Sequence, residues 1–470
     1  MSRTEKRAFD AVIVGAGIGG LVCGCYLAKG GKKVLIVEQH HTPGGYCTSF
    51  RRKQFRFDAA ANSLGGVTRG VLGAVIKELQ LDELVQFTRF DPADIVITND
   101  HTISFWNDIQ HTTEELQRAF PEERRGFDEF LKIFFSPNAA VLSSFRNCTF
   151  QDVLDKYFHS ARLKVILATP LACFTGAPPS QLSALIGYAV FNQQVLDGGY
   201  YPVGGMQAFS NALAGRFKAL GGEMRLSTRA TKFDVQEGQI RGVILNGEER
   251  IPADHVISNC DAKSTFIDLL GREHCSSEML AALSRMVPSI SMYIAYLGVN
   301  DSFGNFLAPG ANIWKLADYN LESIFLQPVD ESLEFKDYMM HISADQKTIT
   351  ALTPVLFKDK QYWSERKSLI LDNFIRQIEL DMVPGLSSKL LYKDAATPVT
   401  LLKYTGNQRG SAYGWAPISS QYAILEFRKP SFIGNLYLTG HWTTYGAGIA
   451  GVSYVGRDTA KKLLKRAKEQ

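Results

Sequence analysis

The residues best suited to bind a ligand form a glycine-rich stretch near the N-terminus. A short apolar run leads directly into Gly15, Gly17 and Gly20, and a second apolar run ends at Glu38. This spacing predicts a strand, a tight turn, a helix and a second strand, in which the glycines let a pyrophosphate approach the positive start of the helix. Glu38 could accept hydrogen bonds from two ribose hydroxyls. The pattern indicates a dinucleotide site, since an ordinary glycine-rich surface loop would need neither the flanking strands nor the acid.

A second pair of glycines, Gly44 and Gly45, decides which dinucleotide fits. The pair follows Glu38 within a few residues, where the chain of an FAD protein passes close to the pyrophosphate as it leaves the second strand. A nicotinamide-binding fold has no need of glycines there. The charge of Glu38 suits an unphosphorylated ribose, because it would repel a 2′-phosphate. We therefore predict FAD as the cofactor.

Another glycine-rich helix start lies near the C-terminus. Residues 436–441 are typical of a buried strand and a turn, and residues 446–452 of the start of a closing helix. The amides of that helix would face the negative charge that builds up on a reduced flavin. An ordinary packing turn is the simpler alternative, and the N-terminal pattern favours the flavin interpretation.

Length and composition exclude several classes of protein. A chain of 470 residues is long for one core and predicts two intertwined domains. The net charge of +4, from 51 basic and 47 acidic residues without a basic stripe, argues against a nucleic-acid partner. The basic C-terminal helix is interpreted as a solvated face, with a weak patch for anionic lipid as the alternative.

The cysteines and the hydropathy of the chain suggest in which cellular compartment the protein lies. The seven cysteines are odd in number and form no C-x-x-C pair, and the histidines are scattered, so we expect a reducing compartment and no metal site. The N-terminus shows no signal-peptide pattern, and no apolar run is long enough to span a bilayer. We expect a cytoplasmic protein, and leave open peripheral contact with a membrane and a homo-oligomer.

The apolar pattern predicts that insertions interrupt the cofactor domain. Segments 1–70, 200–265 and 396–470 would form a discontinuous, Rossmann-like FAD-binding domain of α/β class. Segments 71–199 and 266–395 would build an α+β substrate domain with helices and an antiparallel sheet. Part of this second domain (161–190) is unusually apolar and could line a cavity. A site between two such domains is a common location for a pocket.

Over nearly its whole length, the chain resembles the branch of the FAD-dependent amine oxidase superfamily that contains phytoene desaturases, carotenoid isomerases and retinol saturases. Two further motifs carry the resemblance: Tyr-Pro-Val-Gly-Gly-Met at 201–206, and Thr-Pro-Val-Thr at 397–400 with Gly-Ser-Ala-Tyr-Gly at 410–414. The resemblance implies a cofactor domain of the glutathione-reductase and amine-oxidase type. It also implies hydride transfer to or from a lipophilic polyene or isoprenoid, by a desaturase, a saturase or a redox-neutral isomerase. Tyr46 after the glycine pair and His441-Trp442 depart from the family pattern, which leaves the substrate and the reaction direction open.

The resemblance and the motifs together name the candidate site residues. His441 and Tyr445 are the catalytic candidates; His441 could be an acid, a base or a hydrogen-bond donor to the flavin, or simply be held by the backbone. The resemblance implies that the backbone at 230–232 passes the adenine and that 259–261 lies near the adenosine. The expected cofactor contacts are Gly15, Gly17, Ile18, Gly19, Gly20, Glu38, Gly44, Gly45, Tyr46, Ala230, Gly440, His441, Gly448, Ile449 and Ala450.

Two other functions remain open from the residues alone. A flavin amine oxidase or natural-product oxidase would act on a smaller substrate in a compact pocket with paired aromatic rings. A non-catalytic relative that binds prenyl groups or lipids would have a damaged glycine pattern, and here that pattern is intact. For a polyene, the flavin carries the hydride and the protein needs mainly a long, apolar, water-poor slot.

Overall fold

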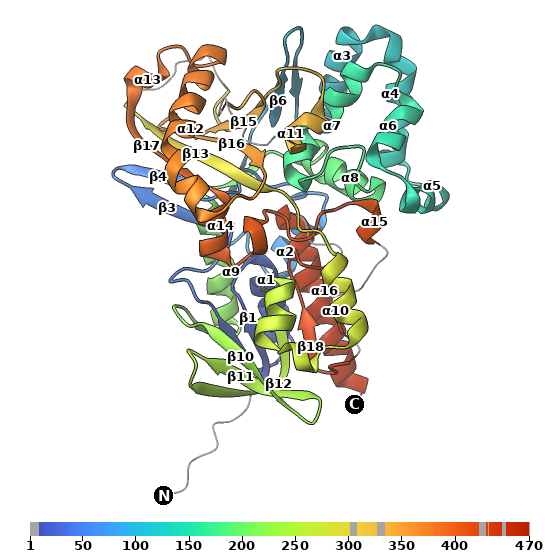
Figure 1. The fold of residues 1–470 in the computed structure, drawn as a ribbon. Coiled ribbons are helices and arrows are strands. Elements are labelled where there is room, and N and C mark those ends of the chain that lie inside the picture. The colour runs from blue at the N-terminus through green and yellow to red at the C-terminus, as the bar shows by residue number, and fades with distance from the viewer. Residues whose placement is uncertain are drawn as a thin grey trace, which may run out of the picture.

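The computed structural model describes residues 9–300, 308–326, 334–422, 429–430, 432–443 and 448–469. Figure 1 shows a lower lobe around β1 (Phe9–Val14) and an upper lobe around β13 (Ser291–Val299). Each lobe is built on its own sheet, and the chain passes between the lobes several times. The division into two intertwined parts follows from these crossings.

The sheet of the lower lobe has a parallel centre. Its order is β10–β11–β12–β1–β2–β9, with β18 beside β12. β1 pairs in parallel with both β2 and β12, so segments far apart in sequence end at one edge of the sheet. The α/β fold class is confirmed. Besides β1, the strands are β2 (Val34–Val37), β9 (Glu223–Arg225), β10 (Ala230–Gln236), β11 (Gln239–Leu245), β12 (Glu249–Ser258) and β18 (Leu436–Leu438).

Helices cover both faces of this sheet. Every residue of α1 from Ile18 to Ala28 is buried, because α9 and α16 pack against it. α2 also packs against α16, and the segment 264–286 joins a core cluster with β12, so both pack with the lower lobe. The helices are α1 (Ile18–Lys29), α2 (Val71–Glu78), α9 (Met206–Ala219), α10 (Ser277–Arg285) and α16 (Gly448–Glu469).

The sheet of the upper lobe is mostly antiparallel, with the order β17–β13–β16–β15–β14–β6–β7. All nine residues of β13 are buried, because its alternate side chains enter two different cores. Met292 and Ile294 belong to one core and Tyr293 and Ala295 to the other. The strands besides β13 are β6 (Asp94–Ile97), β7 (Thr102–Phe105), β14 (Asn312–Lys315), β15 (Tyr338–Ile342), β16 (Thr348–Val355) and β17 (Leu390–Ala396).

Helices flank the upper sheet on both faces. α12 (Lys360–Asp381) packs on one face, and a helical group packs on the other and extends away from it (Figure 1). The apolar segment 161–190 forms two helices of this group, α7 and α8. The group consists of α3 (Ile109–Ala119), α4 (Arg124–Phe135), α5 (Ala139–Ser144), α6 (Phe150–Tyr157), α7 (Ala161–Thr175) and α8 (Ala184–Val190).

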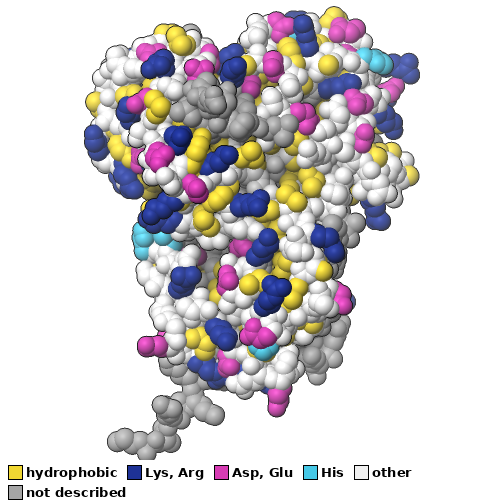
Figure 2. All heavy atoms as spheres, viewed as in Figure 1, with side chains coloured by type: hydrophobic (Ala, Val, Ile, Leu, Met, Phe, Trp, Pro, Cys, Tyr) yellow, Lys and Arg dark blue, Asp and Glu magenta, His cyan; other side chains and the backbone are white. Residues whose placement is uncertain are grey.

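The remaining strands and α-helices are short. They comprise β3 (Ser49–Arg52), β4 (Phe55–Asp58), β5 (Phe87–Arg89), β8 (Tyr200–Pro202), α11 (Leu321–Leu326), α13 (Leu386–Lys389), α14 (Pro398–Thr405) and α15 (Ser419–Tyr422). Figure 2 shows Lys and Arg interspersed with Asp and Glu over the face in view. Within the residues that the structure describes, no helix is both long and apolar enough to cross a membrane.

Candidate functional site

A cavity of about 430 Å³ lies where the two lobes meet. We call it the first cavity. Its walls come from the ends of β1 and β2 in the lower lobe and from β13–β16 in the upper lobe. This size falls within the range of roughly 300–1,000 Å³ that small-molecule sites occupy.

The glycine-rich turn after β1 forms one wall of the first cavity. Gly15 has a φ of +101°, a conformation that favours glycine. A Cβ on Gly20 would stand 2.2 Å from the carbonyl oxygen of Gly15, so the helix can start this close to the strand only with glycine there. Gly17 caps α1 without a side-chain hydrogen bond, and the first turn of α1 contains no acidic residue. The first amides of α1 are therefore suited to an anion.

Glu38 lies at the end of β2 and faces the same cavity. Its carboxylate accepts hydrogen bonds from the main-chain N–H groups of Ala16 at 2.8 Å and His40 at 2.9 Å. The N–H of Gly44 donates to the carbonyl oxygen of Ala16 at 2.8 Å, which draws the second glycine pair onto the turn. The two glycine motifs expected from the sequence are thus brought together around one acid.

Asn259 joins three segments of the site, a role that the sequence analysis missed. Its main-chain N–H donates to Val14, at the end of β1, at 2.8 Å, and its side-chain amide donates to the carbonyl oxygen of Gly15 at 3.3 Å. A Cβ on Gly440 would stand 2.4 Å from Asn259 Oδ1, so the turn after β18 also packs on this side chain. The sequence placed Asn259 near the adenosine only through a resemblance.

The end of the first cavity beyond Glu38 is lined by the start of β10 and by residues after β12. Ala230 lies there, as do Cys260 and Asp261. Burial raises the pKa of Asp261, whose carboxylate accepts from the N–H groups of Ser264 at 3.0 Å and Gln408 at 2.9 Å. This carboxylate holds two loops together at the cavity wall.

His441 follows β18 and lines the first cavity. Its ring centroid lies 6.0 Å from that of Tyr46, and its Nε2 lies 3.4 Å from Oδ1 of Asn407. Exclusion from water lowers the pKa of His441 to about 4, so the imidazole is neutral at physiological pH. Tyr445, the second catalytic candidate, lies outside the described residues.

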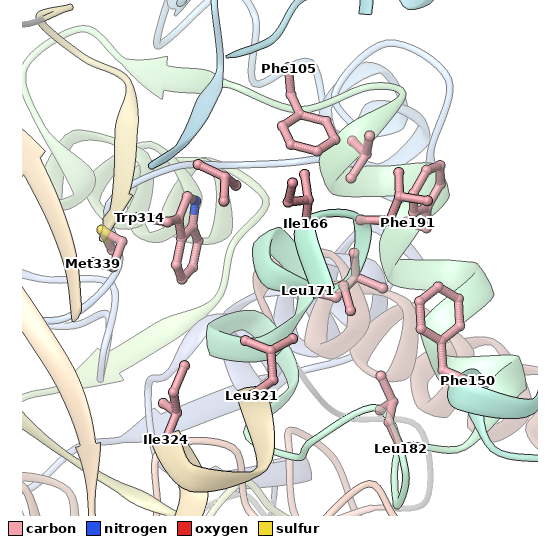
Figure 3. Packing of buried hydrophobic residues seen from close by; sticks show 14 of the residues in the cluster. Phe105, Phe150, Ile166, Leu171, Leu182, Phe191, Trp314, Leu321, Ile324 and Met339 are labelled. Atoms are coloured by element: carbon pink, nitrogen blue, oxygen red, sulfur yellow. The ribbon is translucent and has the colours of Figure 1, made fainter. Parts of the chain in front are cut away.

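The wall from the upper lobe is apolar. Met292 and Ile294 of β13, Trp314 of β14 and Met339 of β15 line it from the sheet, and Phe174 of α7 contributes as well. Figure 3 shows Trp314 and Met339 on the strand side, across from Ile166 and Leu171 of α7. We call this apolar part of the first cavity the slot. It is continuous with the part of the cavity that the glycine motifs line.

A buried carboxyl group holds the indole ring of Trp314 through a hydrogen bond. Asp94 is 2% exposed, and its Oδ1 accepts from the indole N–H of Trp314 at 2.8 Å and from the side-chain amide of Asn312 at 3.1 Å. Burial raises the pKa of Asp94 to about 6, because the charged form loses its hydration. Nothing in the local sequence indicated this group, since its partners lie more than 200 residues away.

A second cavity of about 330 Å³ shares Tyr413 and His441 with the first. Its walls are mainly apolar and come from α8, from residues 415–418 and from α16. Tyr413 belongs to the 410–414 motif, which the sequence analysis noted without a location. The two side chains form the shared wall between the cavities.

Most predicted site residues meet at the first cavity. Gly20 lies beneath the turn, and Ala450 lines the second cavity instead. For all the predicted site residues, including Gly20 and Ala450, the role of cofactor contact stays a prediction. The residues at the first cavity are Gly15, Gly17, Ile18, Gly19, Glu38, Gly44, Gly45, Tyr46, Ala230, Gly440, His441, Gly448 and Ile449.

Proteins named as enzymes are similar to this chain in sequence, and three of them serve as examples. Prolycopene isomerase from Daucus carota is 24% identical, over 96% of this chain and 79% of its own. All-trans-retinol 13,14-reductase from Danio rerio is 24% identical over 92% and 82%. Lycopene-forming phytoene desaturase from Pseudescherichia vulneris is 23% identical over 97% and 99%. The resemblance to this branch is confirmed.

Solved structures share the fold. An oxidoreductase from Methanosarcina mazei matches with a TM-score of 0.67 at 17% identity, over 98% of this chain and 100% of its own. Putrescine oxidase with bound putrescine matches with a TM-score of 0.65 at 15% identity, over the same shares. The family described as flavin containing amine oxidoreductase matches residues 18–464. FAD as the cofactor and an oxidoreductase as the class of enzyme are thereby confirmed. The chain belongs to the family of flavin containing amine oxidoreductases.

Proposed function

We propose that this flavoenzyme transfers hydride to or from a lipophilic polyene or isoprenoid, as a desaturase, a saturase or a redox-neutral isomerase. The observation that carries the proposal is the apolar slot between β13–β16 and α7, which continues from the cavity wall built by the glycine motifs. The relatives named above as acting on carotenoids and retinol support this substrate class.

The lower part of the first cavity has the features that FAD requires. A Cβ on Gly17 would stand 2.8 Å from Asn259 Nδ2, and a Cβ on Gly19 would stand 2.9 Å from Gly440, so only a bare backbone fits there. We propose that the first amides of α1 bind the pyrophosphate, that Glu38 binds the ribose, and that the backbone at 230–232 passes the adenine. When bound, the flavin supplies a hydride acceptor and donor.

The protein groups around the slot would bind, orient and exclude water. Trp314, held by Asp94, gives one wall a fixed shape, and the methionines beside it can adapt to an irregular hydrocarbon. A conjugated substrate delocalises the charge that develops during hydride transfer, so a strong acid or base is not essential. The lipophilic substrate also supports peripheral contact with a membrane; that contact, a homo-oligomer and the domain boundaries given above stay predictions.

Anaerobic mixing tests the proposal. Flavin-loaded protein is mixed separately with carotenoids, retinoids and amines, and the flavin absorbance is followed. We expect a polyene to bleach the oxidised flavin, or, for a saturase, to reoxidise flavin that has been reduced chemically. For an isomerase, product analysis with the reduced enzyme replaces bleaching as the readout. Bleaching by amines alone would overturn the proposal in favour of an amine oxidase.

A further inference from the structure

The side-chain amide of Asn407 contacts two ring nitrogens at the wall of the first cavity. Its Oδ1 lies 2.8 Å from Nε1 of Trp442 and 3.4 Å from Nε2 of His441. Its Nδ2 donates to the carbonyl oxygen of Ser411 at 3.4 Å. Asn407 is 4% exposed and Trp442 is fully buried, so these groups meet away from bulk solvent.

These contacts determine which end of the amide is the oxygen. An indole N–H can only donate a hydrogen bond, so the atom that Trp442 contacts must be the acceptor. The carbonyl group of Ser411 can only accept, so the opposite end of the amide must be the NH₂ group. A histidine nitrogen that faces this oxygen must then carry its proton. Nε2 of His441 is therefore the donor, and Nδ1 is the one acceptor of the neutral ring.

We propose that Asn407 is a positioning residue that fixes His441 as the Nε2–H tautomer, so that the imidazole offers Nδ1 to an N–H donor of a ligand in the first cavity. A heterocyclic N–H of the kind that an isoalloxazine ring carries is the chemical class of that donor, whereas a hydrocarbon polyene has none. From the sequence, His441 could be an acid, a base, a hydrogen-bond donor to the flavin or a side chain held by the backbone. This arrangement indicates a different role, that of a hydrogen-bond acceptor. The inference rests on the flavin part of the proposed function and not on its substrate.

The surroundings of His441 keep its Nε2–H tautomer uncharged. Among the described residues, Tyr46 is the titratable group in ring contact with His441, and its hydroxyl donates to the carbonyl oxygen of Ser411 at 2.8 Å. Burial raises the pKa of Tyr46, so its hydroxyl stays protonated. Asp261 accepts a hydrogen bond from the N–H of Gln408, the residue after Asn407. Within the part of the chain that the structure describes, neutral groups thus hold the imidazole, and the amide oxygen sets its tautomer.

The test uses flavin-loaded protein labelled with ¹³C-histidine, in which ring chemical shifts report both the tautomer and the titration. The signal of His441 is assigned as the one that disappears in His441→Gln. We expect the Nε2–H tautomer from pH 5 to 8 in the native protein. Either the Nδ1–H tautomer or an imidazolium at pH 7 would overturn the proposal.

Two variants isolate the amide oxygen. Asn407→Asp keeps an acceptor for both rings, so we expect the Nε2–H tautomer to persist and the pKa of His441 to rise by at least one unit beside a carboxylate. If the pKa of His441 were unchanged in Asn407→Asp, the side chain at position 407 would not contact the imidazole, and the proposal would be overturned. The double variant Asn407→Leu/Trp442→Phe removes the acceptor without leaving a buried indole N–H unpaired, and its control is Trp442→Phe alone. We expect a mixture of tautomers only in the double variant; identical spectra of the two would overturn the proposal. None of these readouts requires a substrate, so they stand apart from the test of the proposed function.

Discussion

Oε2 of Glu38 accepts a hydrogen bond from the main-chain N–H of Ala16 at 2.8 Å. This contact joins the end of β2 to the turn after β1, at the place where the first amides of α1 face the cavity. The carboxylate therefore both shapes the turn and stands at the cavity wall. Loss of Glu38 should weaken cofactor binding through both effects.

Glu38→Ala should lower the affinity for FAD at least tenfold. The change removes a charged acceptor from two amides, and hydrogen bonds to charged groups contribute roughly 1.5–3 kcal/mol each. Glu38→Gln keeps one acceptor oxygen and should lose less. Flavin fluorescence during titration of the apoprotein measures the dissociation constant. Glu237→Ala, at a side chain that is 90% exposed, is the control. Wild-type affinity in Glu38→Ala would show that the cofactor does not use this acid.

Gly20→Ala should destabilise the protein and release the flavin. The new Cβ would stand 2.2 Å from the carbonyl oxygen of Gly15, which is backbone and cannot turn aside as a flexible side chain could. Overpacking of this kind costs roughly 1–3 kcal/mol. Gly215→Ala is the matched control, because a Cβ there meets nothing within 4 Å and the residue lies inside α9. That control should gain roughly 0.5–1 kcal/mol. Urea unfolding compares the two; equal midpoints would contradict the prediction.

The lower lobe could be predicted from the sequence because its signals are local. The glycine turn is bounded by apolar runs, and these became β1, α1 and β2 with bounds close to those expected. The closing helix and the strand before it, β18, were recognisable in the same way. The choice of FAD rested on Gly44 and Gly45, which the structure brings onto the turn through Ala16.

Part of the upper sheet could not be predicted, because some of its strands are short and their partners are distant. β14 has four residues and pairs in parallel with β6, more than 200 positions earlier in the chain. Neither segment alternates long enough to indicate a strand by itself. Asn259 and the pair of Asp94 and Trp314 were missed for the same reason. Their roles exist only after separate segments have met.

Filling the second cavity should discriminate between substrates by length. Ala189 of α8 lines this cavity, and Ala189→Phe would take up space there without reaching the glycine turn. If a long polyene extends past Tyr413 and His441, turnover of a carotenoid should fall at least tenfold while turnover of a shorter retinoid changes little. The ratio of the two rates is the measurement. Ala281→Phe, at an exposed position on α10, is the control. An unchanged ratio would confine the substrate to the first cavity.

Asp94 should make the stability of the protein fall as the pH rises from about 4 to about 6. Its pKa is raised to about 6 in the folded state from 3.8, so between these values the folded chain binds more protons than the unfolded chain. The folded state thus loses on the order of 3 kcal/mol over this window, at about 1.36 kcal/mol per pKa unit. Asp94→Asn keeps an acceptor for the indole N–H of Trp314 and removes the ionisation. Its free energy of unfolding should not show this decline.

Urea unfolding at half-unit steps between pH 4 and 7 measures that difference. The informative quantity is the stability of Asp94→Asn minus that of the native protein, which should rise with pH and become constant above about pH 6.5. Asp82→Asn, at an exposed carboxyl group, should follow the native curve. A difference that stays flat across the range would mean that Asp94 is ionised in the folded state at pH 4. Its hydrogen bonds from Trp314 and Asn312 would then outweigh the cost of burying the charge.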